Sequence, residues 1–191
     1  MRRVTRDEGR VLKPSLLPTI ASFTIALSTI ALSTIASPAL AQEETIGIPV
    51  GSSVAAPIQV QDLDGNAVDL ADYIGKKPVL VEFWATWCPL CKALMPQIEA
   101  AKARHGDNVD ILIVAVGVGQ SRNSVKRHAA EHPMPGKVFF DVAGAATRAF
   151  SAPSTSYIVT LDAKGKVTYT GLGDKQKVEG AVQKAIGRLG G

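Results

Sequence analysis

The two cysteines of this chain, Cys88 and Cys91, are separated by only two residues. A disulfide between them would close a very small loop. Because the stabilisation from a disulfide grows with the logarithm of loop length, this bond would add little to the stability of a fold. The pair is therefore better explained by chemistry than by structure. Two thiols at this spacing can switch between a dithiol and a disulfide, which predicts a redox site.

The elements around the cysteines support this prediction. The apolar run at residues 79–84 predicts a β-strand, and the segment from Pro89 to about Arg104 predicts a helix. One face of this helix is apolar and carries Leu90, Leu94, Ile98 and Ala101. A cysteine at the start of such a helix lies beside free backbone N–H groups and the positive end of the helix dipole, which favour a thiolate and lower the thiol pKa.

The rest of the chain predicts an α/β domain with a mixed sheet covered by helices. The run at 109–116 predicts a buried strand after the first helix, and the two strands with the helix between them should form a right-handed βαβ unit. The other expected elements are a hairpin with an Asp-Gly turn at 58–70, a polar helix at 121–131, a strand at 137–141, a short helix at 143–150, a second hairpin at 156–170 and a closing helix at 175–189.

The first forty residues have the layout of a secretory signal peptide. A basic start is followed by an apolar stretch at 16–36 and by the small-residue cleavage pattern Ala39-Leu40-Ala41. We expect residues 1–41 to be a cleaved signal peptide, 42–53 a linker and 54–191 one domain. That domain would work in the periplasm or another extracytoplasmic space, where disulfides persist. The alternative is an N-terminal membrane anchor, because the apolar run approaches the roughly twenty residues needed to cross a bilayer.

The charge of the predicted domain is nearly balanced. The net charge of +4 comes largely from residues 1–41, which hold five Lys/Arg and two Asp/Glu and leave 16 against 15 for residues 42–191. A nearly neutral domain gives no support to nucleic-acid binding. No Gly-rich phosphate loop or dinucleotide-binding fingerprint occurs, so we expect no nucleotide cofactor.

Over roughly residues 50–189 the sequence resembles the thioredoxin fold, and within it the exported proteins of the TlpA, ResA and CcmG group. The most specific part is the run from Val81 to Lys92, which matches both tryptophans, Trp84 and Trp87. Pro96, five positions after the second cysteine, matches the helix-kinking proline of the family. The resemblance implies a thioredoxin-like mixed β-sheet flanked by helices, with an N-terminal β-hairpin extension.

The resemblance also implies roles for the residues at the cysteine pair. Cys88 would be the exposed attacking thiol and Cys91 the buried resolving thiol of a redox-active disulfide. Pro89 and Leu90, between the cysteines, should tune the reduction potential and contact the substrate, and Trp87 should shield the thiol and shape the docking surface.

Glu82 matches the position at which thioredoxins carry a buried acid beneath the active site. Val81 and Phe83 should point to one face of the sheet and Glu82 to the other, in a strand that is otherwise apolar. Desolvation should then raise the pKa of Glu82. We expect it to accept a proton from Cys91 and return it. The alternative is a solvated glutamate on an edge strand.

The loop that faces the disulfide in this family carries a cis-proline, and two residues compete for that position. The motif Ala152-Pro153-Ser154-Thr155 favours Pro153, whereas a gap-free count between Phe150 and Gly165 favours Ser156. We favour Pro153 as the residue facing the cysteines and contacting substrate, because a cis peptide bond is essentially a proline phenomenon.

Metal binding is a weaker interpretation of the cysteine pair. A structural zinc site needs four ligands, and the two cysteines supply half of them. His105 follows without a second histidine at finger spacing, and the His128/His132 pair is expected to be solvated. We therefore predict no metal site.

Two other functional classes remain. Peroxiredoxins of the AhpC/TSA type share the fold, but their motif would place a threonine three residues before the cysteine, whereas Thr86 stands two before Cys88. Peroxide reduction is the alternative function. A non-catalytic binding module is disfavoured because both cysteines are retained.

The resemblance thus implies an exported thiol:disulfide oxidoreductase, acting as a reductant that receives electrons from a membrane donor. Its expected substrates are disulfides of other exported proteins, apocytochrome c among them. We expect it to act as a monomer and without a cofactor.

Overall fold

The computed structural model describes residues 46–187. The predicted signal segment lies outside these residues. The elements in chain order are β1 (Gln59–Gln61), β2 (Ala67–Asp69), the 3₁₀ turn η1 (Leu70–Tyr73), β3 (Val79–Trp84), α1 (Pro89–His105), η2 (Gly106–Asn108), β4 (Asp110–Val116), α2 (Arg122–Glu131), β5 (Lys137–Asp141), α3 (Ala145–Ala149), β6 (Tyr157–Leu161), β7 (Val167–Leu172) and α4 (Val178–Ala185).

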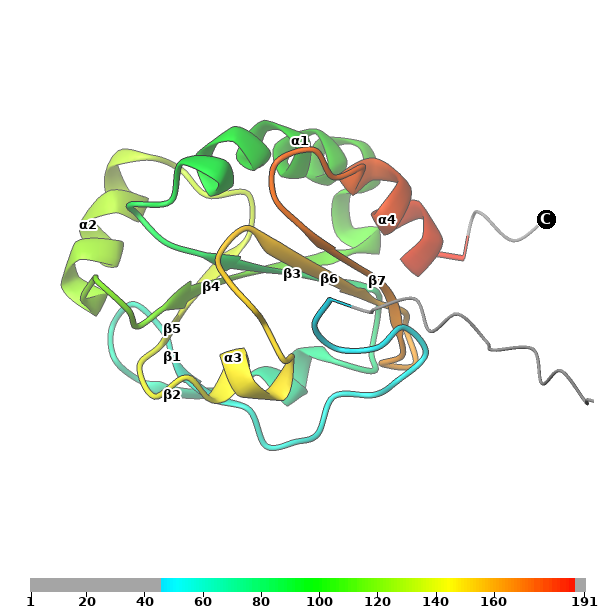
Figure 1. Cartoon of the computed structure of the whole chain (residues 1–191), viewed down its shortest axis with the longest axis horizontal. Helices are drawn as coiled ribbons and strands as arrows, with labels where there is room; N and C mark the ends of the chain where they lie inside the picture. The colour runs from blue at the N-terminus through cyan, green and yellow to red at the C-terminus, as the bar shows by residue number, and fades with distance from the viewer. Residues whose placement is uncertain (1–45, 188–191) are drawn as a thin grey trace, which may run out of the picture. The chain divides into compact units, whose positions relative to one another are not determined.

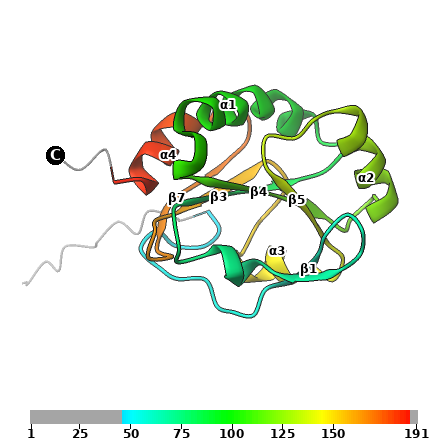
Figure 2. The ribbon, with the colours of Figure 1, turned by 180° about the vertical axis from the view of Figure 1, so that it is seen from behind.

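The strands form one mixed sheet in the order β2-β1-β5-β4-β3-β6-β7. The central strands β3, β4 and β5 are parallel, while β1, β6 and β7 join antiparallel. Helices α1 and α4 lie together on one face of the sheet and α3 lies on the other, in both views (Figures 1 and 2). This confirms the predicted thioredoxin-like α/β fold with its N-terminal hairpin.

Strand β3 is buried along its whole length because it pairs with β4 on one side and β6 on the other. Leu80 and Trp84 belong to the cluster beneath α1 and α4, and Val81 and Phe83 to the cluster on the α3 side. Glu82 lies two positions from both Leu80 and Trp84, so its side chain shares their face of the strand, the α1 side. The end of β3 leads directly into the turn that carries the cysteines.

Helix α4 begins at Val178, later than the sequence pattern predicts. The reason is Gln176, which is buried and whose Nε2 donates to the carbonyls of Ser156 at 3.0 Å and Gly173 at 2.7 Å. These bonds hold the segment before α4 as a loop against the start of β6.

The described part of the predicted linker, residues 46–53, packs against the domain. Ile48 is buried and its N–H donates to the Tyr157 hydroxyl at 3.0 Å. Ser53 forms a bridge with Lys166, and the Gly51 N–H donates to the Val167 carbonyl at 2.7 Å. The domain therefore begins before residue 54. Within residues 46–187, no helix has the length and apolar character needed to cross a membrane.

Candidate active site at the start of α1

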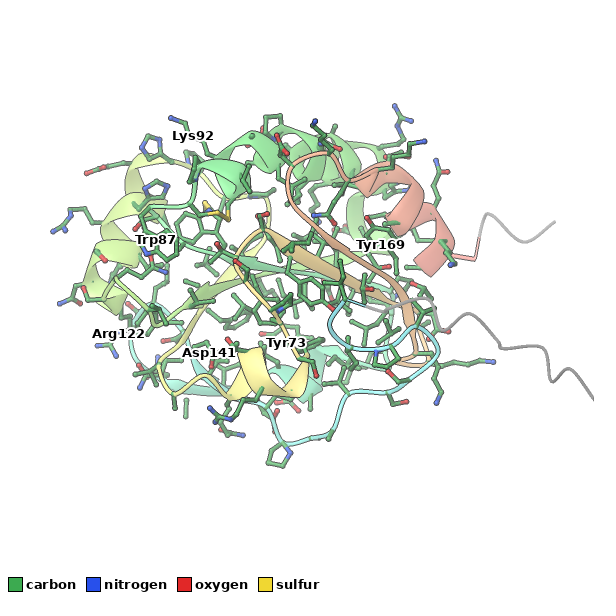
Figure 3. All side chains as sticks on the ribbon, in the orientation of Figure 1. Tyr73, Trp87, Lys92, Arg122, Asp141 and Tyr169 are labelled. Carbon is green, nitrogen blue, oxygen red and sulfur yellow. A yellow bond between two sulfur atoms is a disulfide. The ribbon has the colours of Figure 1, made fainter. Side chains whose placement is uncertain are left out.

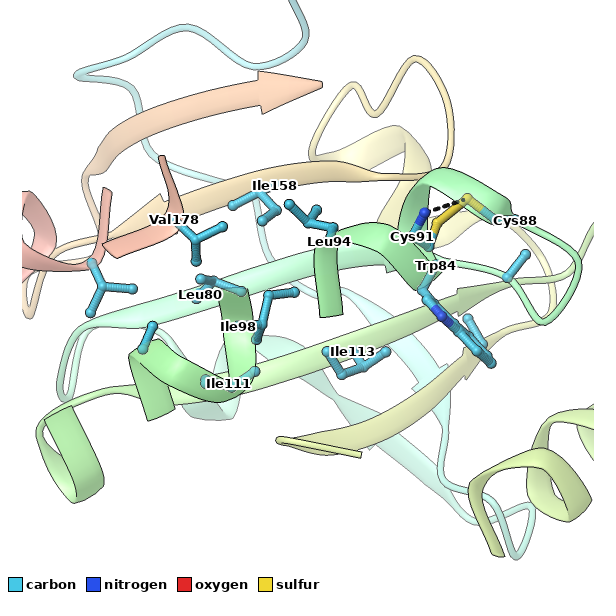
Figure 4. Close-up of a cluster of buried hydrophobic side chains, with 14 of the residues drawn as sticks. Leu80, Trp84, Cys88, Cys91, Leu94, Ile98, Ile111, Ile113, Ile158 and Val178 are labelled. Carbon is cyan, nitrogen blue, oxygen red and sulfur yellow. Dashed lines mark hydrogen bonds between the residues drawn. A yellow bond between two sulfur atoms is a disulfide. The ribbon is translucent and has the colours of Figure 1, made fainter. Parts of the chain in front are cut away.

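Cys88 and Cys91 form a disulfide at the N-terminus of α1. Cys88 is the N-cap of the helix, and its Sγ accepts a hydrogen bond from the Cys91 N–H at 3.1 Å (Figure 4). Pro89 follows at the first helical position, where the missing N–H of proline removes no helical bond. Cys88 keeps 6% of its surface exposed and Cys91 none. An incoming sulfur can therefore reach Cys88 only.

Glu82 is completely buried within the sheet, on the α1 side where Leu80, Trp84 and the disulfide also pack. Its strand neighbours are Ile113 in β4 and Ile158 in β6. Neither carboxyl oxygen has a hydrogen-bond partner among residues 46–187. Desolvation raises the pKa of Glu82 to about 8. A solvated glutamate on an edge strand, the alternative considered from the sequence, does not occur.

The loop before β6 differs from the predicted cis-proline arrangement. The Ala152–Pro153 bond is not cis, and among the described residues only Ala56–Pro57 is. Ser156 is the residue beside the active site. Its backbone has a φ of 59°, and its N–H donates to the Phe83 carbonyl at 2.7 Å, an oxygen that lies 4.0 Å from the Cys91 Sγ.

Proline is incompatible with this backbone. The proline ring fixes φ near −65° and removes the N–H that Ser156 uses. The prediction that Pro153 supplies a cis-proline is wrong, because the bond before it is not cis. Ser156, the position that the gap-free count favours, is the residue that bonds to the end of β3. Pro153 instead lies exposed on the wall of a cavity next to Trp87.

The exposed side chains that flank Cys88 in the sequence are apolar. Trp87 is 51% exposed and Leu90 is 47% exposed, and Pro89 is exposed between the cysteines. Trp87, labelled in Figure 3, lines two hollows. The first, a cavity of about 440 Å³, is lined by Val118, Val142, Ala152, Pro153 and Thr155 among others. The second, a groove of about 360 Å³, contains Cys88 and is lined by Trp84, Lys92, Met95, His128 and Met134 among others.

Asp141 also lines the first hollow, at the end of β5, and the sequence analysis did not select it. Its carboxylate is buried and accepts from the N–H of Ala146 and from the N–H and hydroxyl of Thr147. These bonds hold the start of α3. The Asp141 carboxylate is therefore used in structural hydrogen bonds, and the other residues that line the cavity are uncharged.

The sequence predicts that His128 and His132 are solvated, and His128 is only partly so. His128 packs against Trp84 with ring centroids 5.1 Å apart and against His132 at 4.6 Å, so it is not simply solvated. Burial, followed by the nearby His132, lowers the pKa of His128. His105 is buried and lies 2.9 Å from a Glu179 oxygen. Residues 46–187 contain no group of three or more His, Cys, Asp or Glu side chains that could hold a metal.

The turn before Cys88 is held by Gln120, a residue with no distinguishing pattern in the sequence. Gln120 Oε1 accepts from the Thr86 N–H at 2.9 Å and from the Thr86 hydroxyl at 3.0 Å. Trp87 Nε1 donates to the Val118 carbonyl at 3.0 Å. A lone glutamine in a loop has no sequence signal, because its partners come from another part of the chain.

Comparisons with known proteins find relatives of this chain. The Redoxin family model matches residues 49–185. The thiol-disulfide oxidoreductase YkuV of Bacillus subtilis is 32% identical over 101 residues, 50% of this chain and 67% of the relative. The thiol-disulfide oxidoreductase ResA of Geobacillus kaustophilus is 30% identical over 139 residues, 71% of this chain and 78% of the relative.

Solved structures give the same fold. The exposed lipoprotein thioredoxin Etrx1 of Streptococcus pneumoniae superposes with a TM-score of 0.57 and 26% identity, covering 70% of this chain and 100% of that structure. StoA of Bacillus subtilis superposes with a TM-score of 0.55 and 20% identity, covering 68% of this chain and 97% of that structure.

Proposed function

Because this chain belongs to the Redoxin family, we propose that its Cys88–Cys91 pair exchanges electrons with disulfides of other extracytoplasmic proteins. The activity itself is thiol:disulfide oxidoreduction. One observation carries the assignment to these residues: the disulfide caps a helix, with Cys88 lining an open groove and Cys91 completely buried.

The exchange proceeds in two steps. In the dithiol form, the Cys88 thiolate attacks one sulfur of a substrate disulfide, forms a mixed disulfide and expels the other substrate sulfur as a thiolate. The Cys91 thiolate then attacks the Cys88 Sγ, which re-forms the Cys88–Cys91 bond and expels the second substrate sulfur. Two electrons pass to the substrate. The Cys91 N–H that reaches Cys88 Sγ at 3.1 Å favours the Cys88 thiolate before attack.

Glu82 serves the second step. Cys91 is buried and must lose a proton before it can attack, and Glu82 is the buried carboxyl on the same side of the sheet. A pKa of about 8 lets Glu82 take this proton and return it near neutral pH. Its two unpartnered oxygens support this role, because a buried carboxyl fixed by hydrogen bonds would be less able to exchange a proton.

Trp87, Pro89, Leu90 and Pro153 form the surface on which a protein substrate docks. Their exposed apolar atoms surround Cys88 or line the neighbouring cavity, where no free charge opposes an apolar chain. A protein that must present a disulfide to Cys88 covers these residues as it binds.

The proposal includes the setting of the reaction. The signal-like layout of residues 1–41 supports export to the periplasm, and the resemblance to the TlpA, ResA and CcmG group supports a reductant that receives electrons from a membrane donor. In this role the protein acts as a monomer on substrates such as apocytochrome c. A reduction potential closer to the ~−270 mV of thioredoxin than to the ~−120 mV of DsbA would support the reducing direction, and the reverse would contradict it.

An insulin disulfide-reduction assay tests the activity. The wild-type protein should turn over insulin, and Cys88→Ser should lose all turnover while keeping its circular dichroism spectrum. Unchanged activity in Cys88→Ser would exclude the assignment.

The same samples should consume hydrogen peroxide more slowly than insulin disulfides. Faster peroxide consumption would favour the peroxidase alternative, although the Thr86 hydroxyl is bonded to Gln120 rather than to Cys88.

A further inference from the structure

We propose that Gln120 is a positioning residue for thiol–disulfide exchange, holding the turn that delivers Cys88 to the start of α1. This inference rests on the proposed exchange activity. Gln120 lies in the loop between β4 and α2 and reaches back to the segment between β3 and the first cysteine. It touches neither sulfur, so its effect passes through Thr86.

The turn spans Ala85 to Cys88 and is closed by a hydrogen bond from the Cys88 N–H to the Ala85 carbonyl at 3.1 Å. Thr86 and Trp87 are its two central residues. The backbone N–H of Thr86 has no partner within the turn itself. Gln120 Oε1 supplies that partner at 2.9 Å and accepts from the Thr86 hydroxyl as well.

The orientation of the Gln120 amide is fixed by its partners. A backbone N–H can only donate and a backbone carbonyl can only accept. Oε1 must therefore face Thr86, and Nε2 must face the Val116 carbonyl, to which it donates at 2.7 Å. One side chain thus joins the end of β4 to the turn after β3, and only a group with an acceptor and a donor side by side can do so.

The second central residue of the turn is held by the same loop. Trp87 Nε1 donates to the Val118 carbonyl at 3.0 Å, and Gly119 lies so close that an added Cβ would be 3.1 Å from Trp87 Nε1. Both central residues of the turn are therefore held from residues 116–120. Because Cys88 follows directly and accepts the Cys91 N–H, a shift of the turn would move Cys88 away from the helix N-terminus.

Gln120→Ala removes both bonds to Thr86 and tests the inference. We expect the rate constant for attack on a disulfide to fall roughly tenfold, as the loss of about two hydrogen bonds predicts, and the Cys88 thiol pKa, measured from the pH dependence of alkylation, to rise. Gln97→Ala is the matched control. Gln97 is also half-buried and donates one bond, at 2.9 Å, to a backbone carbonyl, that of Asp174. It should keep the wild-type rate and pKa while losing some thermal stability.

Gln120→Glu separates positioning from simple stabilisation. A neutral carboxyl accepts from Thr86 and donates to Val116, as the amide does, whereas an ionised one presents a bare oxygen to the Val116 carbonyl and a negative charge near Cys88. The ratio of the variant's exchange rate to the wild-type rate should therefore be near one in acid and fall as pH rises, while the ratio for Gln120→Ala should stay low throughout. If Gln120→Ala fails to fold, the pH dependence of the rate ratio for Gln120→Glu is by itself the test of the inference.

Either of two results would overturn the inference. In the first, Gln120→Ala leaves the Cys88 pKa unchanged and keeps an exchange rate within twofold of wild type. In the second, the ratio of the Gln120→Glu rate to the wild-type rate does not change with pH. Either could occur while Cys88→Ser is inactive, so the proposed function would stand. If the wild-type protein reduced no disulfide at all, the proposed function would fail. The alkylation pKa of Cys88 would then still test Gln120, its rise supporting the inference and its constancy contradicting it.

Discussion

The pKa of Glu82 links burial to chemistry at the scale of a single residue. The sequence places one acid in an otherwise apolar strand, and the structure buries it completely without a hydrogen-bond partner among residues 46–187. A carboxyl in this position holds its proton until about pH 8. Its ionisation, rather than that of a surface group, should therefore control the proton of Cys91.

Glu82→Gln should slow the attack of Cys91 on the mixed disulfide by roughly 10²-fold, because the amide cannot accept a proton. In the wild-type protein this rate should rise with pH through about 8 as Glu82 ionises, and the variant should lack that inflection. Single-turnover kinetics across the pH range measure both. Glu131→Gln, a change at an exposed helix residue, is the control. An inflection that persists in Glu82→Gln would assign it to another group.

Trp87→Ala should raise the KM for insulin several-fold and change the rate with a small aromatic disulfide much less. The half-exposed indole contributes apolar area to a protein partner but has little to offer a small reagent. Trp87→Phe keeps most of this area and loses the bond to Val118, so it separates docking from the position of the turn. Equal losses with both substrates in Trp87→Ala would argue against a docking role.

At the scale of elements, α1 and α4 are joined by a partly buried contact. His105 at the end of α1 lies 2.9 Å from Glu179 in α4, and Gln183 donates to the same oxygen at 2.8 Å. Burial alone would raise the pKa of Glu179, but the hydrogen bonds from His105 and Gln183 and the charges of His105 and Arg104 lower it overall.

Glu179→Gln should therefore lower stability by about 1 kcal/mol at neutral pH. A carboxylate with a depressed pKa stabilises the fold above its unfolded pKa and loses this effect as pH falls through its folded pKa. The difference between variant and wild type should accordingly vanish in acid. Chemical denaturation at neutral and acidic pH measures it, and a difference that is the same at both would contradict the role of ionised Glu179.

The elements were largely predictable from sequence, and the loop contacts were not. Periodicity gave β3 and β5 with their bounds and α1 to within one residue, because these segments bury continuous apolar faces. Ser156 and Gln120 act through hydrogen bonds to backbone atoms far away in the sequence, those of Phe83 and Thr86 among them. Nothing local in the sequence records such a partner. The proline at 153 suggested a cis bond that the backbone does not contain.

At the scale of the whole molecule, the buried acid makes stability depend on pH. The folded protein keeps the Glu82 proton to about pH 8, while the unfolded chain loses it near the ordinary glutamate pKa of 4.5. Between these values the unfolded state binds fewer protons, so the free energy of unfolding should fall as pH rises, by up to about 1.4 kcal/mol per pH unit. Glu82→Gln should flatten this decline. The measurement is urea unfolding of the oxidised protein at several pH values. A free energy of unfolding of the wild-type protein that does not decline with pH would contradict the buried state of Glu82.

The fold class could be predicted for the whole domain because the cysteine motif and the order of strands and helices both indicate a thioredoxin-like fold. The residue at which the domain begins could not be predicted. Residues 46–53 have few large apolar side chains, yet Ile48 and the backbone of Gly51 attach them to Tyr157 and Val167. These contacts join segments more than a hundred residues apart and are set by the completed sheet.

Trapping of a mixed disulfide tests most directly the claim that one sulfur attacks and the other resolves. Cys91→Ser, mixed as the reduced protein with a disulfide substrate, should accumulate a covalent adduct through Cys88, seen as a mass shift that dithiothreitol reverses. Cys88→Ser should form none at the same time and pH. An adduct formed equally well through Cys91, or none with either variant, would contradict the assignment.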